Sequence, residues 1–304
     1  MNTALFEELL QHVDKERVFK NEPMSTHTTF RTGGAAEILV QPAVEELAVV
    51  IELCKKYNEP WMVIGNGSNL LVSDEGIAGV VIEFGKYQSE IAILGNQVVA
   101  QAGAMMSAVA NKAAEEGLTG LEFAAGIPGT IGGAVVMNAG AYGGEIKDVL
   151  QFAAILTPEG DVVKMTPEQL ELSYRHSNIP ERDYIVLAAN FKLAEGDMDE
   201  INAKMADLKN QRVSKQPLEY PSAGSTFKRP EGHFAGKLIQ DACLKGYSVG
   251  GAQVSEKHCG FVINTGGATS KDIACLIKDV QAKVKETFGV DLETEVKYVG
   301  KFDE

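Results

Sequence analysis

The chain has 304 residues, of which 45% are hydrophobic and 23% charged, and its formal net charge is -14 at pH 7. This length can hold two or three domains with cores of their own. The acidic balance disfavours a nucleic-acid partner, because such partners are bound through a basic surface. A small phosphorylated ligand is still compatible, since backbone N–H groups and a few local cations can hold it.

The apolar runs fall short of the ~18 residues that a membrane span needs. The segment from Met1 to Leu10 carries Glu7 and Glu8 and lacks a basic-then-apolar signal pattern. We therefore expect a cytoplasmic location without membrane insertion. The four cysteines stand far apart and the five histidines show no zinc-type spacing, so we expect a reduced protein with no metal site. Nothing in the sequence indicates an oligomeric state.

Periodicity and turn residues predict mixed helices and strands along the first 193 residues. Helices are expected at Leu5 to His12, Pro42 to Tyr57 and Ser107 to Glu116, with a short one after Thr166 and Pro167. Strands are expected at Ala36 to Val40, Trp61 to Ile64, Val80 to Phe84, Ile91 to Leu94, Val98 to Ala102, Phe152 to Leu156, Val162 to Met165 and Ile185 to Leu193.

The remainder predicts a charged connecting helix and a further domain. Helices are expected at Met198 to Val213, Phe234 to Leu244 and Ser270 to Phe288, the last with a capping box at Thr269 and Asp272 and a stop at Gly289. Strands are expected at Tyr247 to Val254, Phe261 to Asn264 and Val290 to Val299. The irregular mixture favours an α+β fold over a doubly wound parallel sheet.

Two glycine-rich stretches leave the main chain almost without side-chain cover. The longer runs from Gly126 to Ala134 and continues to Gly144, and the shorter, Gly65 to Asn69, follows a predicted strand. Bare N–H groups at this density are typical of contact with a phosphate or another anionic ligand. Neither stretch matches the P-loop or the Rossmann fingerprint. A tight turn between packed elements is the alternative for both stretches.

Three further places could carry chemistry. Arg175, between Tyr174 and His176, could grip a carboxylate or phosphate through two parallel hydrogen bonds. Ser225, followed by Lys228 and Arg229, could donate a proton or position a phosphate. Glu295 stands on the polar side of an alternating strand. The alternatives are a surface arginine, a polar surface turn and a solvated strand face, and sequence spacing does not show that the three places meet.

Several ordered motifs resemble the UDP-N-acetylenolpyruvoylglucosamine reductase (UDP-N-acetylmuramate dehydrogenase) family over nearly the whole chain. They begin at Thr28 to Gly34 and end at Glu295, and include Gly65 to Leu71, Gly126 to Gly133, Asn138 to Gly143, Tyr174 to Ser177, Ala223 to Pro230 and Ser255 to His258. The resemblance implies an FAD-binding fold of the vanillyl-alcohol-oxidase (PCMH) type in two subdomains, residues 1–84 and 85–197. A C-terminal α/β substrate-binding domain would span residues 198–304, and its last strand could return to the first subdomain.

The resemblance also implies a reaction, in which NADPH reduces non-covalent FAD and the enolpyruvyl ether of UDP-N-acetylglucosamine is then reduced to UDP-N-acetylmuramate for peptidoglycan precursor synthesis. Arg175 would stabilise the charge that develops, Ser225 would protonate C2, and Glu295 with nearby cations such as Lys228 would assist the serine. The substrate would be bound by Tyr174, Arg175, Lys228 and His258. The FAD would be bound by Gly65, Asn66, Gly67, Ser68, Asn69, Leu70, Gly126, Ile127, Pro128, Gly129, Thr130, Gly132, Gly133, Asn138, Ala139, Gly140 and Ala141.

The third region is compact, with Gly250 to Val254 passing directly to Ser255 and His258. It resembles the short form of the family, which lacks the inserted tyrosine-bearing loop that covers the substrate in the longer form. Two other classes of function stay open: an FAD-dependent oxidase of the same fold acting on another substrate, and a non-catalytic nucleotide-binding protein. The presence of Arg175, Ser225 and Glu295 argues against the second.

Overall fold

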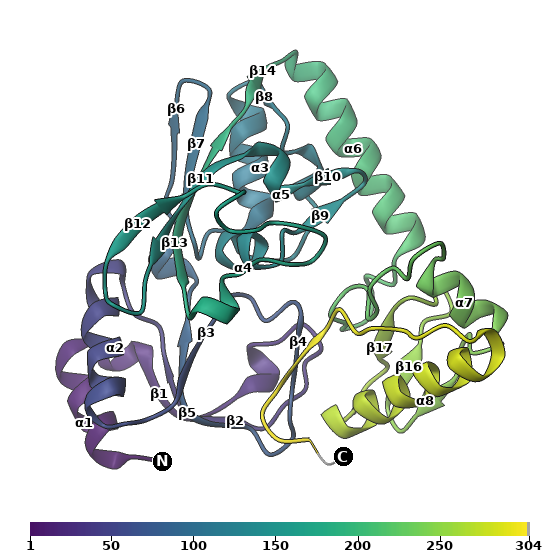
Figure 1. Ribbon diagram of the computed structural model, residues 1–304, viewed down its shortest axis with the longest axis horizontal. Helices are drawn as coiled ribbons and strands as arrows, with labels where there is room; N and C mark the ends of the chain where they lie inside the picture. Colours follow the sequence, from purple (N-terminus) through teal and green to yellow (C-terminus); the bar gives the residue numbers. More distant parts are fainter. Residues whose placement is uncertain (303–304) are drawn as a thin grey trace.

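The computed structural model describes residues 1–302 as three packed parts. An N-terminal unit lies at the lower left of Figure 1, a middle unit above it and a C-terminal lobe at the right. The long helix α6 (Met198–Lys215) runs down one side and connects the middle unit to the lobe. No helix within the described residues is both long and apolar enough to span a bilayer. The division at residues 84 and 197 stays a prediction.

The N-terminal unit is built on a four-stranded sheet in the order β1-β2-β5-β3. Its strands are β1 (Val18–Pro23), β2 (Ala35–Val40), β5 (Ile77–Glu83) and β3 (Trp61–Ile64). The pairs β2–β5 and β3–β5 are parallel. The central run Val80 to Ile82 is completely buried, as expected for a strand covered on both faces. Helices α1 (Thr3–His12) and α2 (Leu47–Lys56) pack against this unit (Figure 1).

The middle unit holds a five-stranded antiparallel sheet in the order β12-β11-β13-β7-β6. The strands are β6 (Ile91–Leu94), β7 (Gln97–Gln101), β11 (Leu150–Leu156), β12 (Val162–Met165) and β13 (Ile185–Lys192). Smaller elements are α3 (Met106–Glu115), α4 (Ile131–Val136), α5 (Ile146–Val149), β8 (Leu118–Thr119), β9 (Gly140–Ala141), β10 (Gly144–Glu145) and β14 (Ala194–Glu195). The N-terminal and middle units share one continuous hydrophobic core.

The C-terminal lobe packs two helices on a small sheet, around a second hydrophobic core that also includes Phe30 and Leu71 of the N-terminal unit. Its elements are α7 (Ala235–Asp241), β15 (Ser248–Val249), β16 (Ala252–Val254), β17 (Val262–Asn264) and α8 (Ser270–Phe288). The predicted capping box at the start of α8 is present, and Gly289 ends the helix at a φ of 69°. The Asp74 carboxylate also accepts hydrogen bonds from the first backbone N–H groups of α8, which ties the lobe to the N-terminal unit.

After α8 the chain leaves the lobe and crosses back over the molecule (Figure 1). Its last strand, β18 (Lys297–Val299), pairs in parallel with β4 (Leu70–Val72). The segment before β18 carries Glu295, and the side-chain amide of Asn69 donates to the Glu295 carbonyl at 3.0 Å. The crossing therefore brings the end of the chain against the glycine loop that precedes β4.

The structure corrects several predicted elements. Residues after Thr166 form a turn, because Glu171 takes a positive φ of 53° before a helix can form. The predicted strand Tyr247 to Val254 is a hairpin of two short strands that turns at Gly250. The predicted last strand is regular only over β18, since the preceding residues pair with another loop. Strand β1 and helix α4 were not predicted from the sequence. The structure also contains short 3₁₀ helices at Lys15–Arg17, Met24–Thr26, Val44–Glu46, Lys86–Gln88, Glu122–Ala124 and Pro180–Arg182.

Candidate active site

Ser225 and Glu295 are brought together by a short backbone pairing. The Glu295 N–H donates to the Thr226 carbonyl at 2.9 Å, and the Lys228 N–H donates to the Glu293 carbonyl at 2.8 Å. Thr226 is fully buried, and its hydroxyl accepts from the Val262 N–H at 3.0 Å. Ser225 itself stays exposed. The pairing anchors the serine loop on the lobe and sets it beside the returning end of the chain.

Arg175 reaches the same place from the middle unit. Its Nε donates to Oε1 of Glu295 at 2.8 Å, and its Nη2 donates to the Gly140 carbonyl at 3.0 Å. The two side chains are 17% and 15% exposed, so the ion pair is largely shielded from water. Arg175 also has a φ of 54°, a left-handed conformation that is uncommon for a non-glycine residue.

The pKa of Glu295 is raised above the ordinary value of a glutamate. Burial raises the pKa of Glu295, and the neighbouring Arg175 guanidinium opposes that rise. A carboxyl group with a raised pKa can hold or pass a proton closer to neutral pH than an ordinary glutamate. The solvated strand face considered as an alternative for Glu295 is therefore wrong.

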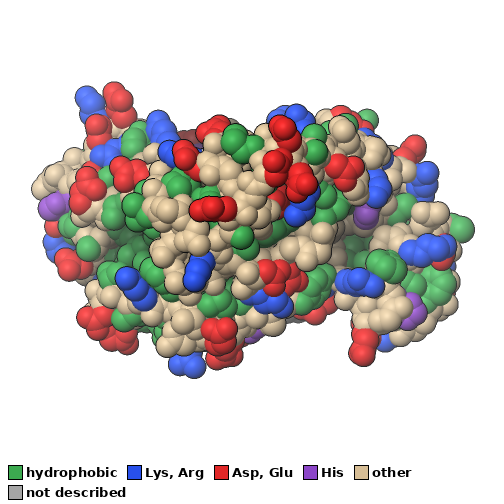
Figure 2. Space-filling view, turned by 90° about the horizontal axis from the view of Figure 1, so that it is seen from above, with side chains coloured by type: hydrophobic (Ala, Val, Ile, Leu, Met, Phe, Trp, Pro, Cys, Tyr) green, Lys and Arg blue, Asp and Glu red, His purple; other side chains and the backbone are tan. Residues whose placement is uncertain are grey.

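Arg175, Ser225 and Glu295 line one cavity of about 420 Å³. Its wall also includes Tyr174 from the middle unit and Phe234, Lys237, Gln240, Lys245, Lys257 and His258 from the lobe. In the space-filling view a recess separates the smaller right-hand lobe from the rest of the molecule (Figure 2). The wall gathers several cations on a chain of net charge -14, which suits an anionic ligand.

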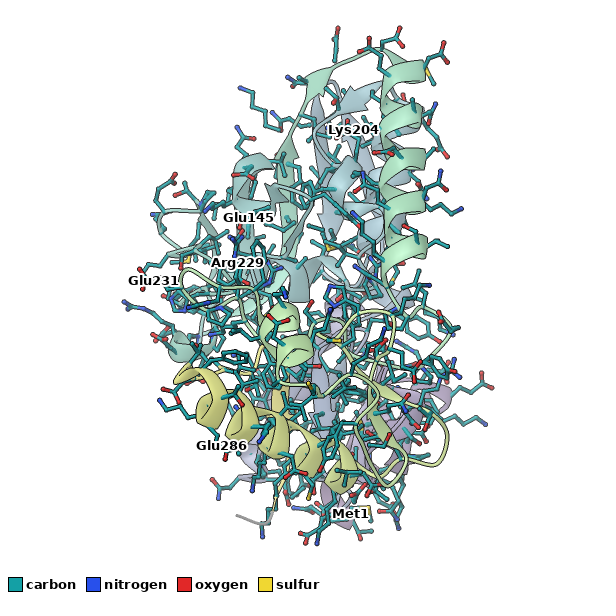
Figure 3. All side chains as sticks on the ribbon, turned by 90° about the vertical axis from the view of Figure 1, so that its right-hand side faces the viewer. Met1, Glu145, Lys204, Arg229, Glu231 and Glu286 are labelled. Carbon is teal, nitrogen blue, oxygen red and sulfur yellow. The ribbon has the colours of Figure 1, made fainter. Side chains whose placement is uncertain are left out.

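Tyr174 and Arg229 lie where the middle unit meets the lobe. The Arg229 N–H donates to the Tyr174 hydroxyl at 3.1 Å, and the Arg229 guanidinium lies 4.0 Å from the centroid of the Phe234 ring. Figure 3 shows Arg229 just below Glu145, at the level of this junction. Both Tyr174 and Arg229 line a second cavity of about 530 Å³ as well.

Lys228 faces that second cavity, where its ammonium pairs with the Glu293 carboxylate. Lys228 lies close enough to Glu295 to favour its charged form. His258 lines the first cavity, and its Nδ1 accepts from the Gly260 N–H at 3.1 Å. Burial lowers the pKa of His258, so a neutral ring is favoured there. Of the residues predicted to bind substrate, Tyr174, Arg175 and His258 thus line the first cavity, whereas Lys228 lines the second.

The two glycine loops contact each other. The Asn66 amide donates to the Pro128 carbonyl at 2.6 Å, and a Cβ on Gly65 would lie 2.0 Å from the Thr130 hydroxyl oxygen. Only glycine allows this close approach. By contrast, a Cβ on Gly129 would meet only the Ser68 hydroxyl, at 3.5 Å. Gly129 therefore faces the gap between the loops.

Many amides of these loops have no acceptor among the described residues. None of the backbone N–H groups from Gly65 to Asn69 donates to another described residue, and the same holds for Gly126, Gly129, Thr130 and Gly133. Unpaired amides on two touching loops form a ready anion-binding surface. The turn considered as an alternative accounts for the shape of the loops but leaves these donors without a function.

Other predicted cofactor residues have their polar groups occupied. The Gly132 N–H donates to the Ala102 carbonyl, and the amides of Leu70, Ile127 and Ala139 bond to nearby carbonyls. Asn138 is fully buried; its side chain donates to Glu145 and the Ser173 carbonyl and accepts from the Lys147 N–H. Pro128 lacks an N–H, Gly140 accepts from Arg175, and Ala141 lies in the β9–β10 hairpin. These residues shape the loops and their supports.

Arg212 was not identified as a candidate binding residue from the sequence. Its side chain lies 3.0 Å from the position that a Cβ on Gly126 would take, and burial lowers the pKa of Arg212. Among the described residues its guanidinium has neither a carboxylate partner nor a hydrogen bond. A partly buried guanidinium without an anion is costly unless a ligand supplies one. One sequence feature could have indicated that Arg212 is unpaired: no acidic residue stands three or four positions from it along α6, where an ion pair within the helix would form.

The fold and the two loops define a flavin-binding protein of the vanillyl-alcohol-oxidase type. A family model described as FAD binding domain matches residues 36–166. An alkyldihydroxyacetonephosphate synthase structure has a TM-score of 0.50 at 18% identity, covering 64% of this chain and 41% of that chain, which is a likeness of fold alone.

The chain belongs to the UDP-N-acetylenolpyruvoylglucosamine reductase family. It is 55% identical to the reductase of that name from Agathobacter rectalis, over 99% of this chain and 100% of that protein, and 55% identical to the one from Lachnoclostridium phytofermentans, over 99% of each chain. The family's C-terminal domain model matches residues 216–299. The crystal structure of the Thermus caldophilus reductase has a TM-score of 0.80 at 36% identity, covering 93% of this chain and 99% of that one. The oxidase alternative has no support from these relatives.

Proposed function

We propose that this protein is an NADPH-dependent, FAD-containing reductase that converts the enolpyruvyl ether of UDP-N-acetylglucosamine to UDP-N-acetylmuramate for peptidoglycan synthesis. The observation that carries the proposal is the meeting of Arg175, Ser225 and Glu295 at one cavity. They come from distant parts of the chain, and their chemistry matches this reduction. The family relationship supports the same reaction. The cytoplasmic location stays a prediction.

The residues of the two loops fit the diphosphate of FAD. Unpaired amides from Gly65 to Asn69 and at Gly129 and Thr130 would hold its phosphate oxygens, and Arg212 would add a positive charge beside Gly126. Binding is proposed to be non-covalent, as the family relationship implies. When bound, FAD would supply the hydride chemistry, accepting a hydride from NADPH and giving one to the vinyl ether.

Arg175 is proposed to stabilise the charge that develops on the substrate. Reduction of the vinyl ether at C3 builds negative charge at C2 and on the adjoining carboxylate. The guanidinium is already oriented by Glu295 and the Gly140 carbonyl, so little reorganisation is needed when the charge appears. Nη1 has no partner within the described residues and stays available for a carboxylate.

Ser225 is proposed to deliver the proton to C2. A serine hydroxyl is a weak acid, so it needs a neighbour that polarises it and replaces its proton. Glu295 lines the same cavity and has a raised pKa because it is buried, which suits a proton reservoir. Arg175 orients the Glu295 carboxyl through the 2.8 Å contact.

The cations of the lobe are proposed to hold the UDP part of the substrate. Lys245 and Lys257 line the first cavity beside the neutral His258 ring, and Lys228 with Arg229 lines the second cavity. Tyr174 and Arg229 form the wall between the two, so a long substrate could occupy both. Titration of the oxidised protein with the UDP-sugar measures its affinity and tests the proposed binding of the UDP part directly. An absorption spectrum that shows a flavin bleached by NADPH and restored by the enolpyruvyl substrate tests the reaction.

A further inference from the structure

His27 is held between two carboxylates. Its Nδ1 lies 2.9 Å from Oε1 of Glu83, and its Nε2 lies 3.2 Å from Oε1 of Glu22. The His27 side chain is only 13% exposed, so water does little to separate these charges. The Gln41 amide donates to the other oxygen of Glu83 at 2.5 Å, which fixes that carboxylate in place.

The arrangement requires a charged imidazole. A neutral histidine has one N–H and one lone pair, so one of the two glutamates would face a lone pair. Only the imidazolium donates to both carboxylates at once. The hydrogen bond with Glu83 raises the pKa of His27 against the effect of burial, and Glu22 adds to the rise.

The histidine lies beneath the loop from Gly65 to Asn69. A Cβ on Gly67 would be 2.0 Å from the His27 carbonyl oxygen, and Gly67 has a φ of 57°, so the loop rests directly on the His27 backbone. The Thr29 N–H also bonds to the Gly67 carbonyl at 3.4 Å. Glu83 pairs in register with Ile64, the residue just before the loop. Both ends of the charged cluster therefore support the same glycine loop.

We propose that His27 is a positioning residue for the cofactor, and that its imidazolium, clamped by Glu22 from β1 and Glu83 from β5, holds the loop from Gly65 to Asn69 in the form that binds FAD. This inference rests on the proposed binding of FAD at that loop. Glu22 and Glu83 are the charged groups that the structure places against the His27 ring, and Gln41 is the neutral one.

The sign of the pH dependence follows from the raised pKa of His27. The clamp is complete at low pH, where the ring is charged in both the folded and the unfolded chain. It is lost as pH rises through the folded-state value, which lies above the ordinary value of 6.5. The affinity for FAD should therefore weaken as the pH rises above the pKa of His27. If the loop amides bound FAD without support from the imidazolium, the titration of His27 would not change the affinity.

The test measures the dissociation constant of FAD for the deflavinated protein by flavin fluorescence, from about pH 6 to about pH 9. For the parent protein the constant should rise by about tenfold as the pH rises through the titration of His27, because the neutral ring no longer donates to both carboxylates and the loop is held less firmly. His27→Gln should bind FAD about tenfold more weakly at the acid end and show no such rise. His12→Gln, at the exposed end of α1, is the matched control and should follow the parent.

Glu22→Gln separates positioning by charge from a merely structural role. It keeps the size of the side chain and removes one of the two carboxylates, so the midpoint of the FAD titration should shift to lower pH. Should His27→Gln fail to fold, this shift decides the matter alone. An unmoved midpoint, or a folded His27→Gln that matches the parent at every pH, overturns the inference and leaves the proposed reductase standing. A parent protein that binds no FAD overturns both.

Discussion

The guanidinium Nε of Arg175 lies 2.8 Å from the carboxylate Oε1 of Glu295, a contact between residues 120 positions apart in the chain. It joins the middle unit to the segment that returns from the C-terminal lobe. Because Ser225 is anchored to the same segment through Thr226, the three side chains meet at one cavity. The path of the last residues thus assembles the candidate active site.

Replacement of Glu295 by glutamine should leave FAD bound and mainly affect the reduction of the substrate. The amide keeps the size of the side chain but can no longer replace the Ser225 proton. We expect reoxidation of the reduced flavin by the enolpyruvyl substrate to slow by about 10-fold or more, measured by stopped-flow absorbance. Glu286→Gln is the matched control, because Glu286 is 70% exposed on α8 and lines neither cavity. Equal slowing of both half-reactions would contradict the role of Glu295.

The two glycines of the longer loop should respond differently to valine. Gly129→Val would place its side chain in the gap between the loops, so a folded but colourless protein is expected. In Gly132→Val the new Cβ would lie 3.1 Å from the Cβ of Ala102. The resulting overpacking should lower the free energy of unfolding by about 1–3 kcal/mol. The ratio of flavin to protein absorbance and a melting curve measure the two effects. Full flavin content in Gly129→Val would count against the placement of FAD.

Arg212→Gln should weaken FAD binding because the guanidinium has no other anion within the described residues. A charge-assisted contact typically contributes about 1.5–3 kcal/mol, so the dissociation constant should rise by at least about tenfold. Lys209→Gln, one turn earlier on α6, is the control for a general loss of charge. An equal effect of the two variants would show that Arg212 makes no specific contact.

Lys228→Ala should weaken binding of the UDP-sugar more than it slows reduction of the flavin by NADPH. The structure pairs Lys228 with Glu293 beside the second cavity, so its effect should be smaller than that of Lys245→Ala, whose side chain lines the first cavity. Calorimetric titration with the UDP-sugar measures both. Unchanged affinity for the UDP-sugar in both variants would contradict the proposal that Lys228 and Lys245 bind the substrate.

Elements with local signals could be predicted from the sequence. Helix α8 begins and ends where its capping box and Gly289 indicate, and β3 matches its apolar run, because these signals are contained within the segment itself. The turn after Thr166 shows the limit of such signals. Its capping residues are present, with the Gln169 N–H bonded to the Thr166 hydroxyl, but the backbone at Glu171 ends the turn before a helix forms.

The site depended on contacts that no local pattern reveals. Alternation placed Glu295 on a solvated face, whereas pairing with Thr226 and the ion pair with Arg175 bury it. Asn138 was counted among the cofactor residues through the family resemblance, yet the surrounding fold uses its whole side chain. Tertiary pairing sets the surroundings of both residues, and spacing along the chain does not reveal it. The contact of Asn138 with the cofactor stays a prediction.

The most direct test of the proposed reaction is stopped-flow absorbance of the flavin in Ser225→Ala, with each reactant added separately. FAD should stay bound, and NADPH should reduce it at the normal rate, because that half-reaction takes no proton from Ser225. Reoxidation by the enolpyruvyl substrate should slow by about 10²–10⁴-fold, the usual cost of losing a positioned acid. Slow reduction by NADPH combined with normal reoxidation by the substrate would contradict the proton-donor role and the account of the site.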